Sequence, residues 1–295
     1  MSSDRCILCE LTEEASCEPF LENFYLKRPF AHAGGCGAFL LSDVGAEIES
    51  LLTSGSEVFI GKLGDQYAGS RPTDRISADS ILESGYTIGF RHVHKTNLKY
   101  ANLRKRFEVV LDAPIDVHFY CTPADQPGFG WHYDAEEVFV LQVSGSKHWY
   151  LRKNSVHPWP LIDAIPTDQR YEREQTPVEH CYLTEGDWLY IPSGYWHKTI
   201  AGAVSTSLSI GAQAATATDY YDYLRPRLIQ SIFWRQRFPS RRPHSDTGSD
   251  LTAQYKNLVE TFLEQLTEEM MRTSTINQFI EQLKKPNSAR ALRNE

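Results

Sequence analysis

Between residues 113 and 212 the sequence breaks into short runs of β-branched and aromatic residues, separated by glycine, proline and aspartate. Several short strands joined by turns predict an antiparallel sandwich or barrel. The strand–helix alternation of a doubly wound sheet is missing from this region. The predicted strands are 115–122, 137–143, 148–151, 188–191 and 205–210.

The flanking regions have a different character. Residues 1–112 mix short helical and extended patterns, and we expect them to form an N-terminal extension that packs on the barrel. Residues 213–295 are predicted to be helical, with one helix at 219–234 and a polar linker at 239–250. Two apolar helix stripes follow the linker. Their members are Leu251, Tyr255, Leu258, Val259, Phe262 and Leu266, and then Ile276, Phe279, Ile280 and Leu283.

These stripes must be buried, either against the barrel or between two copies of the chain. We expect a homodimer formed through the C-terminal helices. No run of about 18 apolar residues exists, which predicts no membrane span. The first residues have no apolar signal-peptide core, so we expect a cytoplasmic protein. The formal net charge of −8 disfavours a nucleic-acid partner.

Six cysteines occur in the chain, and three of them lie near the N-terminus. Cys6 and Cys9 form a C-x-x-C pair, with Cys17 a little further on. A zinc site usually needs a second pair at matching spacing, and the sequence has none. The composition therefore favours free thiols, and metal binding by this trio stays open.

Two aromatic motifs carry the chemistry: FGWHYD at 129–134 and GDWLYIPSGYWH at 186–197. Side chains two residues apart in an extended segment point the same way, so His132 and Asp134 face one side. His197, after the later strand, supplies a third ligand. Two imidazoles and one carboxylate make the facial triad of non-haem iron, which leaves positions open for a co-substrate and dioxygen.

Further residues favour a dicarboxylate co-substrate beside this metal. Lys147 lies fifteen residues after the first histidine ligand, and Tyr120 lies twelve before it. A buried lysine is costly unless an anion pairs with it, and a dicarboxylate co-substrate supplies that anion. Ser205, Ser207 and Ser209 alternate on one face of the last strand.

The motifs together closely resemble the JmjC-type cupins of the ribosomal oxygenase group. The resemblance rests on 120–123, 129–134, 138–149 and 186–197, with 24–30 similar to that family's entry segment. It extends over about residues 17 to 212. It implies a mainly β fold with helices, a double-stranded β-helix of the jelly-roll or cupin type, that binds Fe(II) and 2-oxoglutarate.

The resemblance also implies roles for individual residues. His132, Asp134 and His197 would bind the metal, and Lys147 would hold the far carboxylate of 2-oxoglutarate with Tyr120 hydrogen-bonded to it. Ser209 would add a third contact, with Ser205 and Ser207 as alternatives. The remaining candidate pocket residues are His118, Trp131 and Gln142.

Two departures from the family pattern bear on the substrate. His118 stands where the family usually has asparagine, and the C-terminal winged-helix module is reduced to two or three helices. We expect hydroxylation of a protein or peptide side chain. Hydroxylation of a small molecule or biosynthetic peptide and removal of an N-methyl group remain alternatives. A non-oxidative metal-binding cupin is the alternative from another class, although it needs no dicarboxylate anchor.

Overall fold

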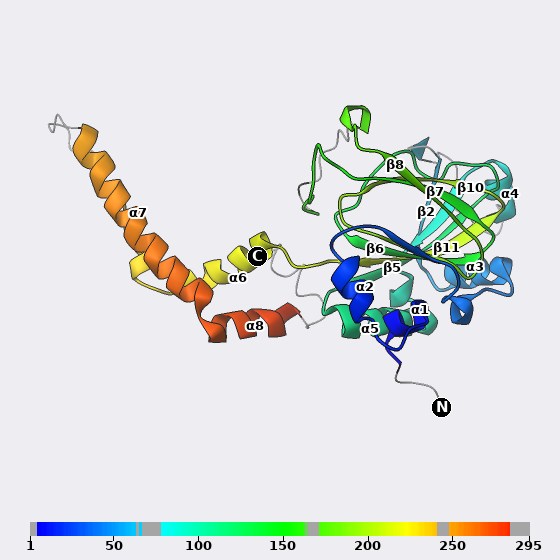
Figure 1. Ribbon diagram of the computed structural model, residues 1–295, viewed down its shortest axis with the longest axis horizontal. Coiled ribbons are helices and arrows are strands. Elements are labelled where there is room, and N and C mark those ends of the chain that lie inside the picture. Colours follow the sequence, from blue (N-terminus) through cyan, green and yellow to red (C-terminus); the bar gives the residue numbers. More distant parts are fainter. Residues whose placement is uncertain are drawn as a thin grey trace. The chain divides into compact units, whose positions relative to one another are not determined.

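The computed structural model of the chain describes residues 5–62, 65–66, 78–162, 164, 171–240 and 248–283. The chain divides into two compact units, Met1–Ala214 and Ala215–Glu295. Residues 241–247 of the expected linker lie outside the described residues. Figure 1 shows the first unit as a β-structure with helices beside it, and the second as helices only.

Two antiparallel sheets form the first unit. The larger has the order β1 (Phe30–His32), β9 (Trp188–Ile191), β6 (Glu137–Ser144), β11 (Ser205–Ala212), β5 (Ile115–Thr122), β4 (Thr87–Arg91), β2 (Glu57–Lys62), β3 (Asp65–Gln66). The smaller has the order β10 (Trp196–Ala201), β7 (Lys147–Arg152), β8 (Val178–Leu183). This arrangement confirms the double-stranded β-helix. The sequence predicted β5 and β9 with their observed bounds but missed β8 and β10.

The alternation of side chains along β5 separates the core from the interior of the barrel. Val117 and Phe119 are completely buried in the main hydrophobic core, whereas His118 and Tyr120 point to the opposite face. Helix α5 (Leu98–Leu111) adds Phe107 to the same core. One face of the strand therefore anchors the fold and leaves the other free for a site.

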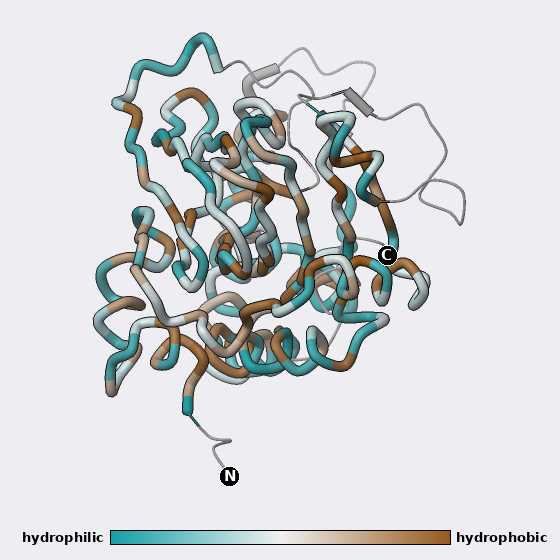
Figure 2. The backbone as a smooth tube through the Cα atoms, turned by 90° about the vertical axis from the view of Figure 1, so that its right-hand side faces the viewer, coloured by the Kyte–Doolittle hydropathy of each residue, from teal (hydrophilic) through white to brown (hydrophobic). Residues whose placement is uncertain are grey.

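The N-terminal region contributes to the large sheet as well as packing beside it. Strands β1 to β4 extend that sheet at both edges. The other helices of the unit are α1 (Ile7–Leu11), α2 (Glu18–Asn23), α3 (Val44–Thr53) and α4 (Ala78–Glu83), with 3₁₀ turns at η1 (Gly37–Phe39), η2 (Val93–Lys95) and η3 (Tyr171–Arg173). In Figure 2 several helices in the lower part of the view alternate hydrophobic and hydrophilic residues. Their apolar sides supply the core.

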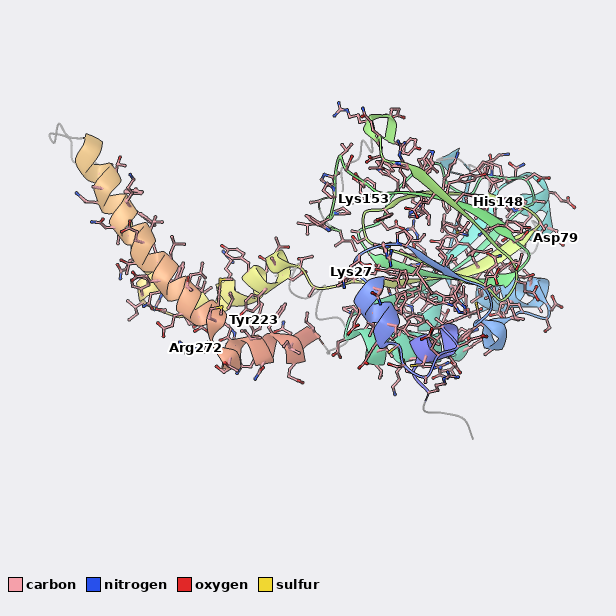
Figure 3. All side chains as sticks on the ribbon, in the orientation of Figure 1. Lys27, Asp79, His148, Lys153, Tyr223 and Arg272 are labelled. Atoms are coloured by element: carbon pink, nitrogen blue, oxygen red, sulfur yellow. The ribbon has the colours of Figure 1, made fainter. Side chains whose placement is uncertain are left out.

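The second unit contains α6 (Ala217–Leu228), the 3₁₀ turn η4 (Phe233–Arg235), α7 (Gly248–Met271) and α8 (Thr273–Leu283). Figure 3 marks Tyr223 on α6 and Arg272 between α7 and α8. The predicted helix at 219–234 was wrong at its end, since α6 stops at Leu228. Pro226 removes a backbone donor from its last turn. No helix in the described part of the chain is long and apolar enough to cross a membrane.

Candidate active site

A backbone bridge between two distant segments brings the two triad histidines together. The N–H of His132 donates to the carbonyl of His197 at 3.1 Å, and the reverse bond is 2.8 Å. The N–H of Gly194 donates to the carbonyl of Asp134 at 2.8 Å. The three candidate ligand atoms lie within 4.8 Å of one another. The expected triad is thus assembled by main-chain contacts on both sides.

Hydrogen bonds fix the orientation of both imidazoles. His132 Nδ1 lies 2.8 Å from the carbonyl of Gly130, and His197 Nδ1 lies 3.0 Å from the carbonyl of Tyr195. A carbonyl only accepts, so each Nδ1 must carry the proton. Nε2 is then the ring atom left to bind a metal. His197 Nε2 lies 3.5 Å from Asp134 Oδ2, so it faces the carboxylate.

The charge state of His197 suits a metal ligand. Burial, and next the neighbouring His132, lowers the pKa of His197 to about 4. The ring is therefore neutral at physiological pH and keeps its lone pair. The carboxylate of Asp134 is 43% exposed, which leaves the site open on its side.

Lys147 is a buried cation without a counter-ion. Its residue exposure is 3%, and its ammonium donates to Ser207 Oγ at 3.0 Å. Among the described residues, no carboxylate lies within ion-pair distance of it. Burial lowers the pKa of Lys147 to about 8. An unpaired ammonium inside a protein is expensive, so this position fits an anionic ligand.

A single pocket connects this lysine with the triad. The pocket has a volume of about 110 Å³ and is bounded by both sheets. The residues that line it are Thr87, Tyr120, Thr122, Gly128, Phe129, His132, Asp134, Val138, Val140, Lys147, Trp149, His197, Thr199, Ser207 and Ser209. The small serines of β11 leave the space that larger side chains would fill.

The three serines of β11 have different surroundings in the structure. Ser207 is the serine in contact with Lys147, and Ser209 lines the same pocket. Ser205 lies outside the pocket lining, where its Oγ accepts from Gln142 Nε2 at 2.7 Å. Gln142 also donates to the carbonyl of Ser144 at 2.8 Å. The hydrogen bond between the side chains of Gln142 and Ser205 stabilises the irregular β6–β11 pairing beside Ser207.

His118 belongs to a polar group next to the pocket rather than to its lining. His118 Nδ1 accepts from the N–H of His92 at 3.4 Å, and His92 Nδ1 lies 3.0 Å from Asp116 Oδ1. Burial lowers the pKa of His118 to about 4. His92, His94 and Asp116 also cluster within 4.8 Å. Their hydrogen bonds within the group account for their arrangement without a ligand.

Trp131 lies in an aromatic group away from the pocket lining. Its ring stacks on Tyr171 at 4.3 Å, and Lys198 Nζ lies 5.2 Å above the Trp131 ring. The sequence missed Trp149 and Thr199 as lining residues. Trp149 lies two residues after Lys147 on β7, and Thr199 lies two residues after His197 on β10. Alternation along each strand would therefore have predicted that both face the pocket. Phe129 is on a loop and had no such signal.

The residues present fit Fe(II) and 2-oxoglutarate. Two imidazole Nε2 atoms and one carboxylate are the donor set of non-haem iron sites. Lys147 has an uncompensated charge that could pair with the far carboxylate. The Tyr120 hydroxyl has no hydrogen-bond partner among the described residues, and burial raises its pKa, so it stays a neutral donor. The indole N–H of Trp149 is likewise buried without a partner.

Comparison with known proteins agrees with this geometry. The JmjC domain family matches residues 92–220. Ribosomal oxygenase 2 of Mus musculus is 25% identical over 206 residues, 66% of this chain and 43% of that protein. The bifunctional lysine-specific demethylase and histidyl-hydroxylase NO66 of Culex quinquefasciatus is 38% identical over 115 residues, 39% of this chain and 18% of that protein. This chain therefore spans less than half the length of these relatives.

Solved structures support the fold. The ribosomal oxygenase YcfD from Escherichia coli, in complex with cobalt and 2-oxoglutarate, superposes with a TM-score of 0.59 at 20% identity. The alignment covers 90% of this chain and 70% of that one. At this identity the likeness concerns the fold alone. Residues 92–220 are therefore similar to the JmjC domain family, and the chain as a whole is similar to the ribosomal oxygenases.

Proposed function

We propose that this protein is an Fe(II)- and 2-oxoglutarate-dependent oxygenase that hydroxylates a protein or peptide side chain. The observation that carries the proposal is the buried, unpaired ammonium of Lys147 in the same pocket as His132, Asp134 and His197. A simple metal-binding cupin has no use for such a charge. The similarity to ribosomal oxygenases adds independent support.

The two ends of the pocket have different tasks. His197 and Lys147 lie on adjacent strands, and Lys147 pairs with Ala201, four residues beyond His197. Strand spacing separates the two backbone levels by about 13 Å. The long lysine side chain occupies part of that distance. The remainder suits a short dicarboxylate held between the metal ligands and the ammonium.

The chain's own residues bind, orient and shield. His132, Asp134 and His197 would hold Fe(II), while Lys147, with Tyr120 and either Ser207 or Ser209, would hold the far carboxylate. When bound, iron and 2-oxoglutarate supply the oxidative decarboxylation that activates dioxygen and inserts one oxygen atom into a C–H bond. Val138 and Val140 keep the pocket wall apolar and limit water near the reacting centre.

The first test is succinate release with Fe(II), 2-oxoglutarate and a candidate substrate. His132→Ala removes a metal ligand, so we expect turnover to fall by more than about 100-fold. His180→Ala is the matched control, because His180 is exposed on β8. Activity that survives His132→Ala would refute the triad.

The second test concerns the co-substrate anchor. Lys147→Ala removes the charge that pairs with the far carboxylate, at a cost of about 2 kcal/mol or more. The KM for 2-oxoglutarate should rise roughly 30-fold. Lys105→Ala, at an exposed position on α5, should leave it unchanged. An unaltered KM in Lys147→Ala would remove the argument for 2-oxoglutarate.

The substrate class is decided by the product. Hydroxylation adds one atom from labelled dioxygen to a protein or peptide, which mass spectrometry detects. Demethylation releases formaldehyde instead, and a small-molecule hydroxylase leaves every peptide unmodified while consuming the small molecule. Ribosomal proteins are the first candidate substrates to test, because one relative is named ribosomal oxygenase 2. The net charge of −8 supports a basic substrate.

We also propose that the second unit forms a homodimer and that the protein works in the cytoplasm. The apolar residues left exposed on α7, which include Val259 and Leu263, support the dimer. The six free cysteines support a reducing compartment.

A further inference from the structure

Three thiols converge outside the pocket, near the start of the chain. The sulfur atoms of Cys6, Cys9 and Cys17 lie within 4.8 Å of one another, and all three cysteines are free. Cys9 is buried, and the other two are half-buried. Nothing in the proposed oxygenase chemistry uses these side chains, so their meeting needs its own explanation.

Two short helices bring the thiols together. Cys6 immediately precedes α1, Cys9 lies inside α1, and Cys17 immediately precedes α2. The guanidinium of Arg5 donates to the carbonyl of Glu14 at 2.6 Å, which ties the start of α1 to the connecting loop. Residues eight apart in sequence, Cys9 and Cys17, thus reach the same point.

Packing on the barrel holds this arrangement in place. Helices of five and six residues are not stable alone. Leu8 and Leu11 of α1 and Phe20 of α2 are buried in the main core. The indole N–H of Trp188, on β9, donates to the carbonyl of Leu11 at 2.7 Å. The three thiols are therefore preorganised by the same core that supports the pocket.

The spacing of the thiols favours a single metal ion over the other chemistries of cysteine. Tetrahedral zinc with Zn–S bonds of about 2.3 Å places its sulfur ligands about 3.8 Å apart. An iron–sulfur cluster binds its thiolates on different iron atoms and spreads them more widely. A disulfide would use two of the cysteines and leave the third unexplained.

Electrostatics points the same way. Three thiolates this close repel one another, so they cannot ionise together without a cation between them.

We propose that Cys6, Cys9 and Cys17 bind one zinc ion as a structural site separate from the active site, with a non-cysteine fourth ligand. Binding forms three sulfur–zinc bonds and releases the thiol protons, and nothing is oxidised or reduced. The ion fastens α1 to α2 and so fixes the N-terminal segment on the barrel. Sequence spacing alone argued against this site because a second C-x-x-C pair is missing.

The test uses the full-length protein loaded with cobalt(II), which reports its ligands by absorption. Thiolate ligands give a sulfur-to-cobalt charge-transfer band in the near ultraviolet, and the histidine–carboxylate triad gives none. We expect this band in the wild type and in His132→Ala, and its loss in Cys17→Ser. Cys181→Ser is the matched control, since Cys181 is half-buried on β8 outside the trio.

Zinc content and thiol reactivity complete the test without any variant. The wild-type protein should carry one equivalent of zinc that stays bound when the metal at the triad is exchanged. A chelator should remove this zinc and expose three additional reactive thiols. Added zinc should restore protection and the original Tm. A wild type without the thiolate band, Cys17→Ser with the band intact, or a disulfide within the trio would overturn the proposal. Succinate release is scored separately, so failure here is distinct from failure of the oxygenase assignment.

Discussion

At the scale of single residues, Lys147 has the most consequential environment in the pocket. Burial lowers its pKa to about 8, well below the ordinary value of 10.5. Ser207 is the one hydrogen-bond acceptor for its ammonium among the described residues. Its charge is therefore available to a ligand but is lost in mildly alkaline solution.

This environment predicts a pH-dependent affinity for 2-oxoglutarate. The lysine of the free protein is charged below about pH 8 and pairs with the far carboxylate, whereas above that pH it must first take up a proton. We expect the dissociation constant to rise as pH increases through 8, approaching tenfold per unit. Titration calorimetry from about pH 7 to pH 9.5 measures it.

Lys147→Arg is the control, because a guanidinium stays charged over the whole range. The variant should bind more weakly but with a flat profile. Equal slopes for the wild type and Lys147→Arg would assign the pH effect to another group.

At the scale of elements, the β6–β7 hairpin connects the core strand β6 to Lys147, the proposed anchor for the co-substrate. Its turn contains Gly145 with φ of +66°, in the left-handed region that favours glycine. A Cβ at this position would lie 2.1 Å from the carbonyl oxygen of Val204, next to the start of β11. The turn is therefore packed tightly against the strand that carries Ser207, and it positions Lys147 two residues later.

Gly145→Ala should therefore lower the free energy of unfolding by about 1–3 kcal/mol, since both the backbone and its neighbour must shift. Urea denaturation measures the loss. Gly37→Ala is the matched control, because an added Cβ there has no neighbour within 4 Å. Similar stability of the two variants would show that the close approach to Val204 is relaxed at little cost.

At the scale of the whole molecule, the second unit buries only part of its apolar surface. Tyr223 and Leu224 of α6 form a small core with Phe279 of α8. On α7, Val259 is 43% exposed and Leu263 is 55% exposed. They lie four residues apart and so share one helix face. This face supports the proposed dimer.

Charge on that face should separate the two copies. Val259→Glu combined with Leu263→Glu places carboxylates where the partner would pack, so we expect the dimer to become a monomer in light scattering. Gln265→Glu combined with Thr267→Glu adds the same charge at exposed polar positions of α7 and should leave the mass unchanged. A wild type that is already monomeric at micromolar concentration would refute the dimer.

The fold class and the central candidate residues of the site could be predicted from the amino-acid sequence. Alternation with period two predicted the inward positions of β5, and the H-x-D spacing with a later histidine predicted three candidate ligands that the structure brings together. These features are local, because a strand imposes its period on neighbouring residues. Between residues 113 and 212 the sequence missed β8 and β10, which contain polar residues that obscure this pattern.

Which distant side chains meet could not be predicted before the three-dimensional fold was known. Ser207 of β11 meets Lys147 of β7 between the two sheets, and the irregular β6–β11 pairing directs Gln142 to Ser205. His118 joins His92 across the sheet. The three N-terminal thiols converge because their helices pack on the barrel. Each of these contacts depends on the packing of segments that are far apart in the chain, and the whole core sets that packing rather than any local pattern.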